Sequence, residues 1–262
     1  MEKVYNLPYL TLLFYTCLII IPIIIFYYLK LRLTKKFLIS VGRMIVQLLL
    51  VGLYLKFIFS LNNILINIGW VLLMLFVANI SILYQSGLSF KKFYLRTFPA
   101  YFLSALFIFF SLLLIFDFNT LISARYLIPL EGMVLGNILR SNIIGLERFY
   151  SELLKGEKEY IQYLLLGAKT SEALKPFLRE AYKAAITPQI GGMATIGLVS
   201  LPGMMTGQIL GGSSPIVAIK YQIMIMIAIF LSVSISVFLS INFSKKSAFD
   251  NFNRLDKEIY RK

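Results

Sequence analysis

Long apolar segments recur along the whole chain and limit its fold more than any other feature. Seven of them approach or exceed the roughly 18 residues that a membrane-crossing helix needs. They lie at 9–29, 37–58, 64–84, 98–116, 127–146, 187–207 and 216–242. Hydrophobic residues make up 59% of the chain, against roughly 45–50% in soluble domains. The sequence therefore predicts an all-α, polytopic integral membrane protein, with one transmembrane domain over residues 1–262. The first segment is interpreted as a span and not as a signal peptide, because no small-residue cleavage site precedes Lys30.

The positions of the basic residues predict the topology. The formal net charge is +14, and most of the basic residues outside the spans fall in segments expected on one side of the membrane: 30–36, 91–96, 147–186 and 243–262. The opposite side offers Lys3, Lys56, Arg125 and Lys220. By the positive-inside rule, the N-terminus is expected outside and the basic tail 243–262 in the cytoplasm, as in a multi-pass protein of the cell (plasma or inner) membrane. The charge then reflects topology and contact with anionic lipid head groups, and no nucleic-acid partner is expected.

The residues that most enzymes and metal sites use are scarce. Histidine is absent and Cys17 is the one cysteine, so a disulfide, a zinc site or a redox pair cannot be built within this chain. The string GAKT at 167–170 lacks the preceding glycine of a phosphate-binding loop, and metalloprotease or serine-hydrolase motifs are missing. We therefore expect neither an enzyme nor a bound cofactor.

Residues 187–215 form a charge-free stretch that holds seven of the sixteen glycines. Within it, 187–190 are expected to complete the preceding polar segment, the run to Leu201 to form a span, and 202–215 to form a turn rich in Gly and Met. Broken, glycine-lined elements at membrane depth must lie against protein or a water-filled cavity, which makes this stretch a candidate for a moving or substrate-contacting part.

Close-approach motifs mark two candidate parts of a pathway or gate. Gly132 and Gly136 form one GxxxG, and Gly203, Gly207 and Gly211 form a double one; such spacing lets membrane helices approach closely. The full candidate set is Glu131, Gly132, Met133, Gly136, Asn137, Pro202, Gly203, Met204, Met205, Gly207, Gln208 and Gly211. Metal contact by Glu131, Met133, Met204 and Met205 is one interpretation; simple packing of the methionines is the other.

Two further polar positions inside spans have alternative interpretations. Glu131 is the one acid inside a predicted span, where it would face a cavity or a partner. Alternatively, Pro129 delays the helix start and leaves Glu131 at the wet interface. Arg43 and Gln47 share a face of the span 37–58, where Arg43 either snorkels to the head groups or contributes to the pathway.

The segment 147–186 is the one long polar stretch between spans, and its pattern is helical. Leu174, Phe177, Leu178 and Ala181 lie on one stripe, with Lys175 and Arg179 largely off it. Pro176 is expected near a helix start. We expect a cytoplasmic pair of helices that docks a partner.

The strings LLLGAKTSEALKPFL and ITPQI resemble the coupling loop of ABC transporter permeases, with Leu166, Gly167, Ala168, Phe177, Pro188 and Ile190 at matching places. Glu159 best matches the family's acid, although EYIQ replaces its two alanines. The resemblance implies that Glu159, Leu166, Gly167, Ala168 and Phe177 couple the chain to a separate ATPase subunit.

A longer resemblance covers nearly the whole chain. The strings IPLEGMVLGN, LLLGAKTSEALKPFLREA and GLVSLPGMMTGQILGGSSPIVAIKYQI resemble the FetB-type iron-export permeases and the plant aluminium-tolerance permeases, and Arg43 with Gln47 fits the same family. Glu131 departs from the pattern, which more often has an apolar residue there. The resemblance implies a pair of permeases working with a cytoplasmic ABC ATPase that holds ATP and Mg, and export of iron or another metal. The alternatives are an ATP-independent channel or secondary transporter, or an ABC permease for an organic solute such as a nucleotide sugar.

Overall fold

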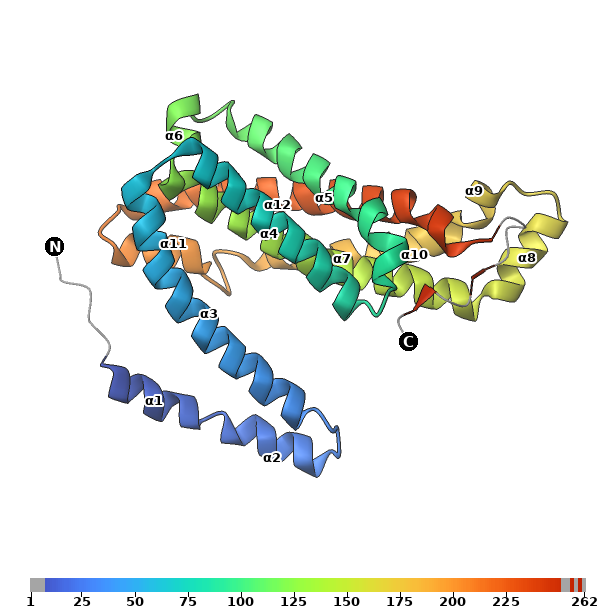
Figure 1. Ribbon diagram of the computed structural model, residues 1–262, viewed down its shortest axis with the longest axis horizontal. Coiled ribbons are helices and arrows are strands. Elements are labelled where there is room, and N and C mark those ends of the chain that lie inside the picture. Colours follow the sequence, from blue (N-terminus) through green and yellow to red (C-terminus); the bar gives the residue numbers. More distant parts are fainter. Residues whose placement is uncertain (1–7, 251–254, 257–258, 261–262) are drawn as a thin grey trace. The chain divides into compact units, whose positions relative to one another are not determined.

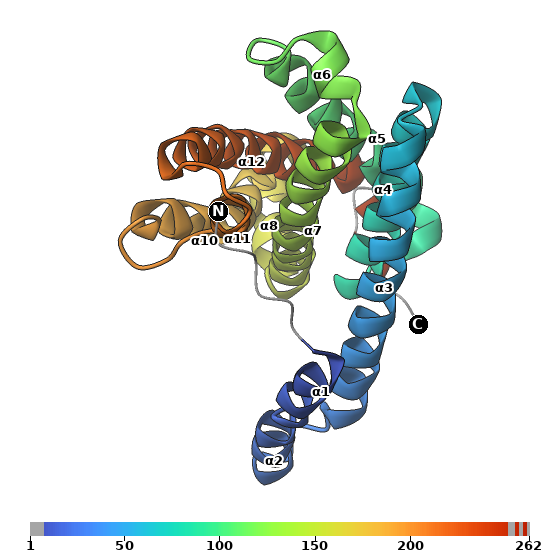
Figure 2. The ribbon, with the colours of Figure 1, turned by 90° about the vertical axis from the view of Figure 1, so that its left-hand side faces the viewer.

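The computed structural model describes residues 8–250, 255–256 and 259–260. The N-terminus, which is expected outside, and parts of the predicted tail lie beyond the described residues; these are residues 1–7, 251–254, 257–258 and 261–262. Regular structure in this part of the chain is helical, as expected, and two compact units are present, residues 1–62 with 210–212 and residues 63–209 with 213–262. Figures 1 and 2 show the helices in two views.

The first unit contains three apolar helices: α1 (Tyr9–Cys17), α2 (Ile20–Tyr28) and α3 (Thr34–Leu61). The predicted first span is therefore two helices joined by a turn. Pro22 explains the break, because it cannot donate a backbone hydrogen bond to Leu18 and lies here in the first turn of α2, where a proline costs least. At the end of α3, Asn62 adopts a left-handed conformation with φ 41°, which asparagine tolerates better than most residues.

The second unit is a bundle built around one long helix. Its elements are α4 (Ile64–Gln85), α5 (Phe90–Leu112), α6 (Phe118–Ile122), α7 (Ala124–Lys155), α8 (Glu157–Leu165), α9 (Thr170–Ala173), α10 (Lys175–Thr195), α11 (Gly203–Leu210), α12 (Pro215–Ser244) and the 3-10 turn η1 (Lys245–Ala248). Helix α7 packs against α4, α10 and α12, while α12 also packs along α5. Fully buried Phe93, Ile138 and Val233 lie in the apolar core that these contacts form.

Five helical segments in the described residues are long and apolar enough to cross a membrane, against about seven predicted. They are Tyr9–Tyr28, Thr34–Leu61, Ile64–Gln85, Phe90–Leu112 and Pro215–Ala248. The predicted span 127–146 lies inside α7, whose composition includes Glu131 and Arg140. The predicted span 187–207 is not one helix: it comprises the end of α10, an irregular segment and the start of α11.

Several boundaries differ from those predicted. The span expected at 98–116 begins at Phe90, because Lys91 and Lys92 lie in the first turn of α5, where Lys92 pairs with Asp256 at 2.6 Å. The polar segment expected at 147–186 begins inside α7, which continues to Lys155. Helix α10 runs on through Pro188, since a membrane-protein helix can lose one backbone hydrogen bond without ending.

Candidate pathway and docking element

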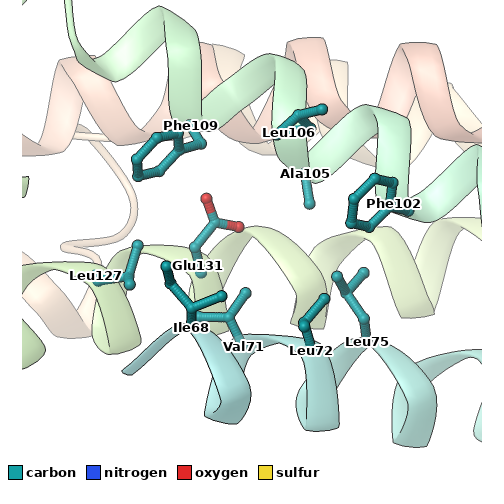
Figure 3. A pocket seen from close by; sticks show the side chains of 10 residues that line it. All are labelled: Ile68, Val71, Leu72, Leu75, Phe102, Ala105, Leu106, Phe109, Leu127 and Glu131. Atoms are coloured by element: carbon teal, nitrogen blue, oxygen red, sulfur yellow. The ribbon is translucent and has the colours of Figure 1, made fainter. Parts of the chain in front are cut away.

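Glu131 lies on α7 in the middle of a cavity of about 280 Å³. The cavity is open on one side and is lined by side chains of α4, α5 and α7 (Figure 3). Its other lining residues are Ile68, Val71, Leu72, Leu75, Phe102, Ala105, Leu106, Phe109 and Leu127. The Glu131 side chain is 2% exposed, and in the described residues neither carboxylate oxygen has a hydrogen-bond partner. Helix α7 begins at Ala124, so Pro129 does not delay its start, and the Glu131 side chain is buried among apolar side chains.

A chain of polar side chains joins α7 to α12. Asn142 donates to Ser236 at 2.8 Å and accepts from Ser240 at 2.6 Å, and all three are buried. About two turns farther along α7 and one turn beyond Ser240 on α12, Tyr150 donates to Ser244 at 2.7 Å. Hydrogen bonds between side chains of neighbouring helices hold membrane bundles together where the hydrophobic effect is weak. This polar chain therefore fixes the register of α7 on α12.

Sequence reasoning missed these polar residues, although the sequence carries a signal for them. Ser232, Ser236, Ser240 and Ser244 recur every four residues on α12, and such spacing places them on one face of a helix. All four are buried. A second missed residue is Gln189 on α10, which donates to the predicted pathway residue Asn137 at 3.4 Å.

The glycines predicted to bring helices together face open space. A Cβ atom at Gly132, Gly136, Gly203 or Gly207 would meet nothing within 4 Å. The close approach lies instead at Gly145, where a Cβ would come within 3.0 Å of Val237 on α12 and 3.4 Å of Ala185 on α10. The GxxxG glycines thus remain available for contact with another molecule.

The remaining pathway candidates lie apart from the Glu131 cavity. Met133 and Met204 are partly buried and pack against the hydrophobic core. Pro202 and Met205 are half-buried, Gly211 is exposed, and the buried Oε1 of Gln208 has no hydrogen-bond partner in the described part of the chain. No set of three or more His, Cys, Asp or Glu side chains in the described residues could hold a metal ion. Arg43 and Gln47 are exposed on α3.

The predicted docking element comprises α8, α9 and the first turns of α10. Phe177 is buried at the elbow between α7 and α8, where a Cβ at Gly156 would lie 2.7 Å from its ring. Tyr160, Ala173 and Leu174 are also buried. Because Pro176 falls at the start of α10, as predicted, it costs no internal hydrogen bond there. The elbow is thus packed and not a loose linker.

An exposed apolar tip follows α8. Leu165 is 81% exposed and Leu166 is 85% exposed. Gly167 then reverses the chain at φ 89°, with the N–H of Gly167 bonded to Leu164 and the N–H of Ala168 bonded to Tyr163, both at 3.0 Å. This is the Schellman pattern that ends a helix on glycine. We call Leu165, Leu166 and Gly167 the docking tip.

Charged groups flank the docking tip. The exposed Glu159 accepts a hydrogen bond from Tyr163 at 3.1 Å, and this contact raises the pKa of Tyr163. On the other side, Glu172 accepts from the Lys169 N–H at 2.8 Å and so caps α9. The tip therefore offers two leucines between polar borders, an arrangement suited to insertion into a groove on a partner.

Comparison with known proteins supports a membrane permease. The family described as "Uncharacterised protein family (UPF0014)" matches residues 9–249. A UPF0014 membrane protein of Synechocystis sp. is 35% identical over 211 residues, which are 77% of this chain and 78% of the relative. The "Probable iron export permease protein FetB" of Escherichia coli is 34% identical, with 79% of each chain covered. "Protein ALUMINUM SENSITIVE 3" of Arabidopsis thaliana is 29% identical over 79% of this chain and 75% of the relative. No solved structure matches the chain significantly.

Proposed function

Because the chain belongs to the UPF0014 family of multi-pass membrane permeases, we propose that it is the membrane-spanning subunit of an ABC transporter. A separate cytoplasmic ATPase would bind ATP and Mg and drive transport. In this proposal the chain itself is not an enzyme and binds no cofactor. Two copies of the permease would assemble with the ATPase subunits.

The docking tip is the observation that carries this proposal. It is apolar, highly exposed and set on a packed elbow at the end of α7. A partner that pushed on such a tip would move α7 as a rigid body. Closure of the ATPase subunits would reach the membrane helices in this way. Leu166, Gly167 and Ala168 lie at the tip, Glu159 lies beside it, and Phe177 anchors it.

The length of α7 supports a crossing that extends into the cytoplasm. Its 32 residues give a helix of about 48 Å at about 1.5 Å per residue, against a hydrocarbon core of about 30 Å. We therefore propose that α7 crosses the membrane once and that α10 and α11 together cross it once more. With the five apolar helical segments, these make seven crossings, the number predicted from the sequence. The basic segments 30–36, 91–96, 147–186 and 243–262 would then lie in the cytoplasm, with the N-terminus outside.

Export of iron or another metal is the proposed activity, supported by the name of the Escherichia coli relative. The open glycines of α7 and α11 would line or gate the pathway, since small residues allow helices to slide against each other. Transport by this route requires ATP hydrolysis in the partner.

Co-purification with the ATPase tests the docking assignment. We expect Leu166→Asp to reduce recovery of a co-expressed ATPase subunit at least tenfold, because a charge would replace an apolar anchor. Leu114→Asp is the matched control, since Leu114 is 88% exposed but lies between α5 and α6, on the predicted outer side. Full ATPase recovery with Leu166→Asp would show that the tip is not the docking element.

Metal content of cells tests the substrate. Cells that lack the protein should accumulate iron, and the wild-type gene should restore export. Unchanged iron together with altered export of an organic solute contradicts the metal assignment. Transport that persists after deletion of the ATPase gene indicates a channel or secondary transporter instead.

A further inference from the structure

The Glu131 carboxyl group has a chemical requirement that its own chain does not meet. It is 2% exposed, and nine apolar residues complete the lining of its cavity. Both oxygens lack a hydrogen-bond partner among the described residues. Without a partner, a buried carboxyl group stays protonated, so Glu131 carries its negative charge only when a cation binds beside it. Figure 3 shows the carboxyl group pointing into the cavity between Phe109 and Ala105.

The lining indicates what kind of cation fits. Hard metal ions such as Ca²⁺ and Mg²⁺ take about six oxygen ligands, and this cavity offers a single carboxylate. An organic ammonium ion has the reverse needs, since it carries N–H donors for two oxygens and an apolar body for the walls. A secondary ammonium, with two N–H groups, would satisfy both carboxylate oxygens and leave no donor unpaired.

The size and the aromatic walls agree with such a ligand. A cavity of about 150 Å³ lined by aliphatic and aromatic residues holds benzene, and this one measures about 280 Å³. It therefore has room for one aromatic ring with a short alkylamine chain. Phe102 and Phe109 stand on the α5 side of the cavity (Figure 3), and aromatic faces attract cations.

The cavity also has a route of entry. Ile68, Phe102 and Leu106 line it, yet their side chains remain 43%, 36% and 37% exposed. A hydrophobic amine can therefore reach Glu131 by moving these side chains, without unfolding the bundle.

We propose that the cavity between α4, α5 and α7 is a binding site for a small hydrophobic ammonium ion, with Glu131 as its counter-ion. The site does not depend on coupling to an ATPase. It is separate from the part of the α7 surface that carries Gly136. A Cβ at Gly136 would meet nothing within 4 Å, whereas the Glu131 side chain faces α4 and α5.

Calorimetric titration of the purified full-length protein in detergent tests the proposal. The probe is N-methylphenethylamine, a secondary amine that is charged at pH 7, and butylbenzene is its neutral counterpart. We expect saturable binding of the amine at one site per chain, with at least tenfold weaker binding of butylbenzene. Glu131→Gln keeps the size of the side chain but removes the charge, so amine binding should weaken at least tenfold. Glu147→Gln is the matched control, because Glu147 is an exposed acid on the same helix.

A second variant tests the location without touching the charge. Ala105→Leu places a larger side chain in the cavity and should weaken binding of both compounds, with helical content unchanged by circular dichroism. Amine binding that survives both Glu131→Gln and Ala105→Leu would overturn the proposal. So would equal affinities for the amine and butylbenzene, or the absence of saturable amine binding to the wild-type protein.

Discussion

Asn142 and Glu131 lie on the same helix and are both buried, but their polar atoms have opposite surroundings. Asn142 has its amide and carbonyl groups bonded to Ile138, Ser236 and Ser240. Glu131 has neither oxygen bonded within the described residues. A satisfied polar group fixes a structure, whereas an unsatisfied one is a place where a ligand can bind. A buried polar side chain on α7 therefore has a structural role at Asn142 and, in the proposed site, a binding role at Glu131.

Asn142→Ala should lower the stability of the bundle by roughly 1–2 kcal/mol, since two interhelical hydrogen bonds disappear. The loss stays moderate because Ser236 and Ser240 also bond to carbonyls of their own helix. Thermal unfolding in detergent would measure it. Asn242→Ala is the control, because exposed Asn242 bonds to Phe238 and Lys245, both within four residues of it, and holds no second helix. Equal melting temperatures for the two variants would contradict the structural role of Asn142.

Gly167→Ala should loosen the docking tip. At φ 89° an L-residue is strained by roughly 1–2 kcal/mol, so the Schellman end of α8 should open. Hydrogen exchange of residues 157–173 would rise, and ATPase recovery would fall. Gly69→Ala is the matched control, because Gly69 is helical and a Cβ there meets nothing within 4 Å. Unchanged exchange in Gly167→Ala would show that the turn does not need glycine.

At the level of elements, the glycines of α7 are of two kinds: Gly145 is packed between helices, and Gly136 lies at an open surface. Gly145→Leu should destabilise the bundle by roughly 1–3 kcal/mol, since its side chain would enter the junction of α7, α10 and α12. Gly136→Leu should leave the melting temperature of the isolated chain unchanged, because its surroundings are open. Thermal unfolding of the two variants checks this difference. A clear loss of stability in Gly136→Leu would show that an internal neighbour covers that face.

The sequence predicted the helical elements better than their ends and contacts. Apolar length identified α4 and α12 to within two residues and α3 to within three at each end, because membrane helices need long apolar runs. Charges misplaced other ends: Lys91 and Lys92 suggested a loop, although both lie inside α5. Glu131 was recognisable as the one acid in a predicted span. Which helices surround it could not be predicted, since that depends on packing between distant segments.

The topology of the whole chain gives a prediction for intact cells. In a Cys17→Ser background, Asn119→Cys should react with a membrane-impermeant maleimide, because the segment between α5 and α7 is expected outside. Ser171→Cys, on α9, should react only after permeabilisation. Both side chains are exposed in the structure, so the labelling depends on the side of the membrane on which each one lies. The reverse pattern would invert the proposed orientation.

Helix α7 has a mechanical consequence. No proline interrupts it between Glu131 and Lys155, so those residues form a stiff rod of about 36 Å at about 1.5 Å per residue. If the rod tilts by roughly 5° about its docked end, its far end sweeps about 3 Å, close to the width of a water molecule. A shift too small to disturb the elbow would thus be enough to narrow or widen the cavity around Glu131. In the proposed transporter, the helix would act as a lever that converts a small movement at its docked end into a change of volume around Glu131.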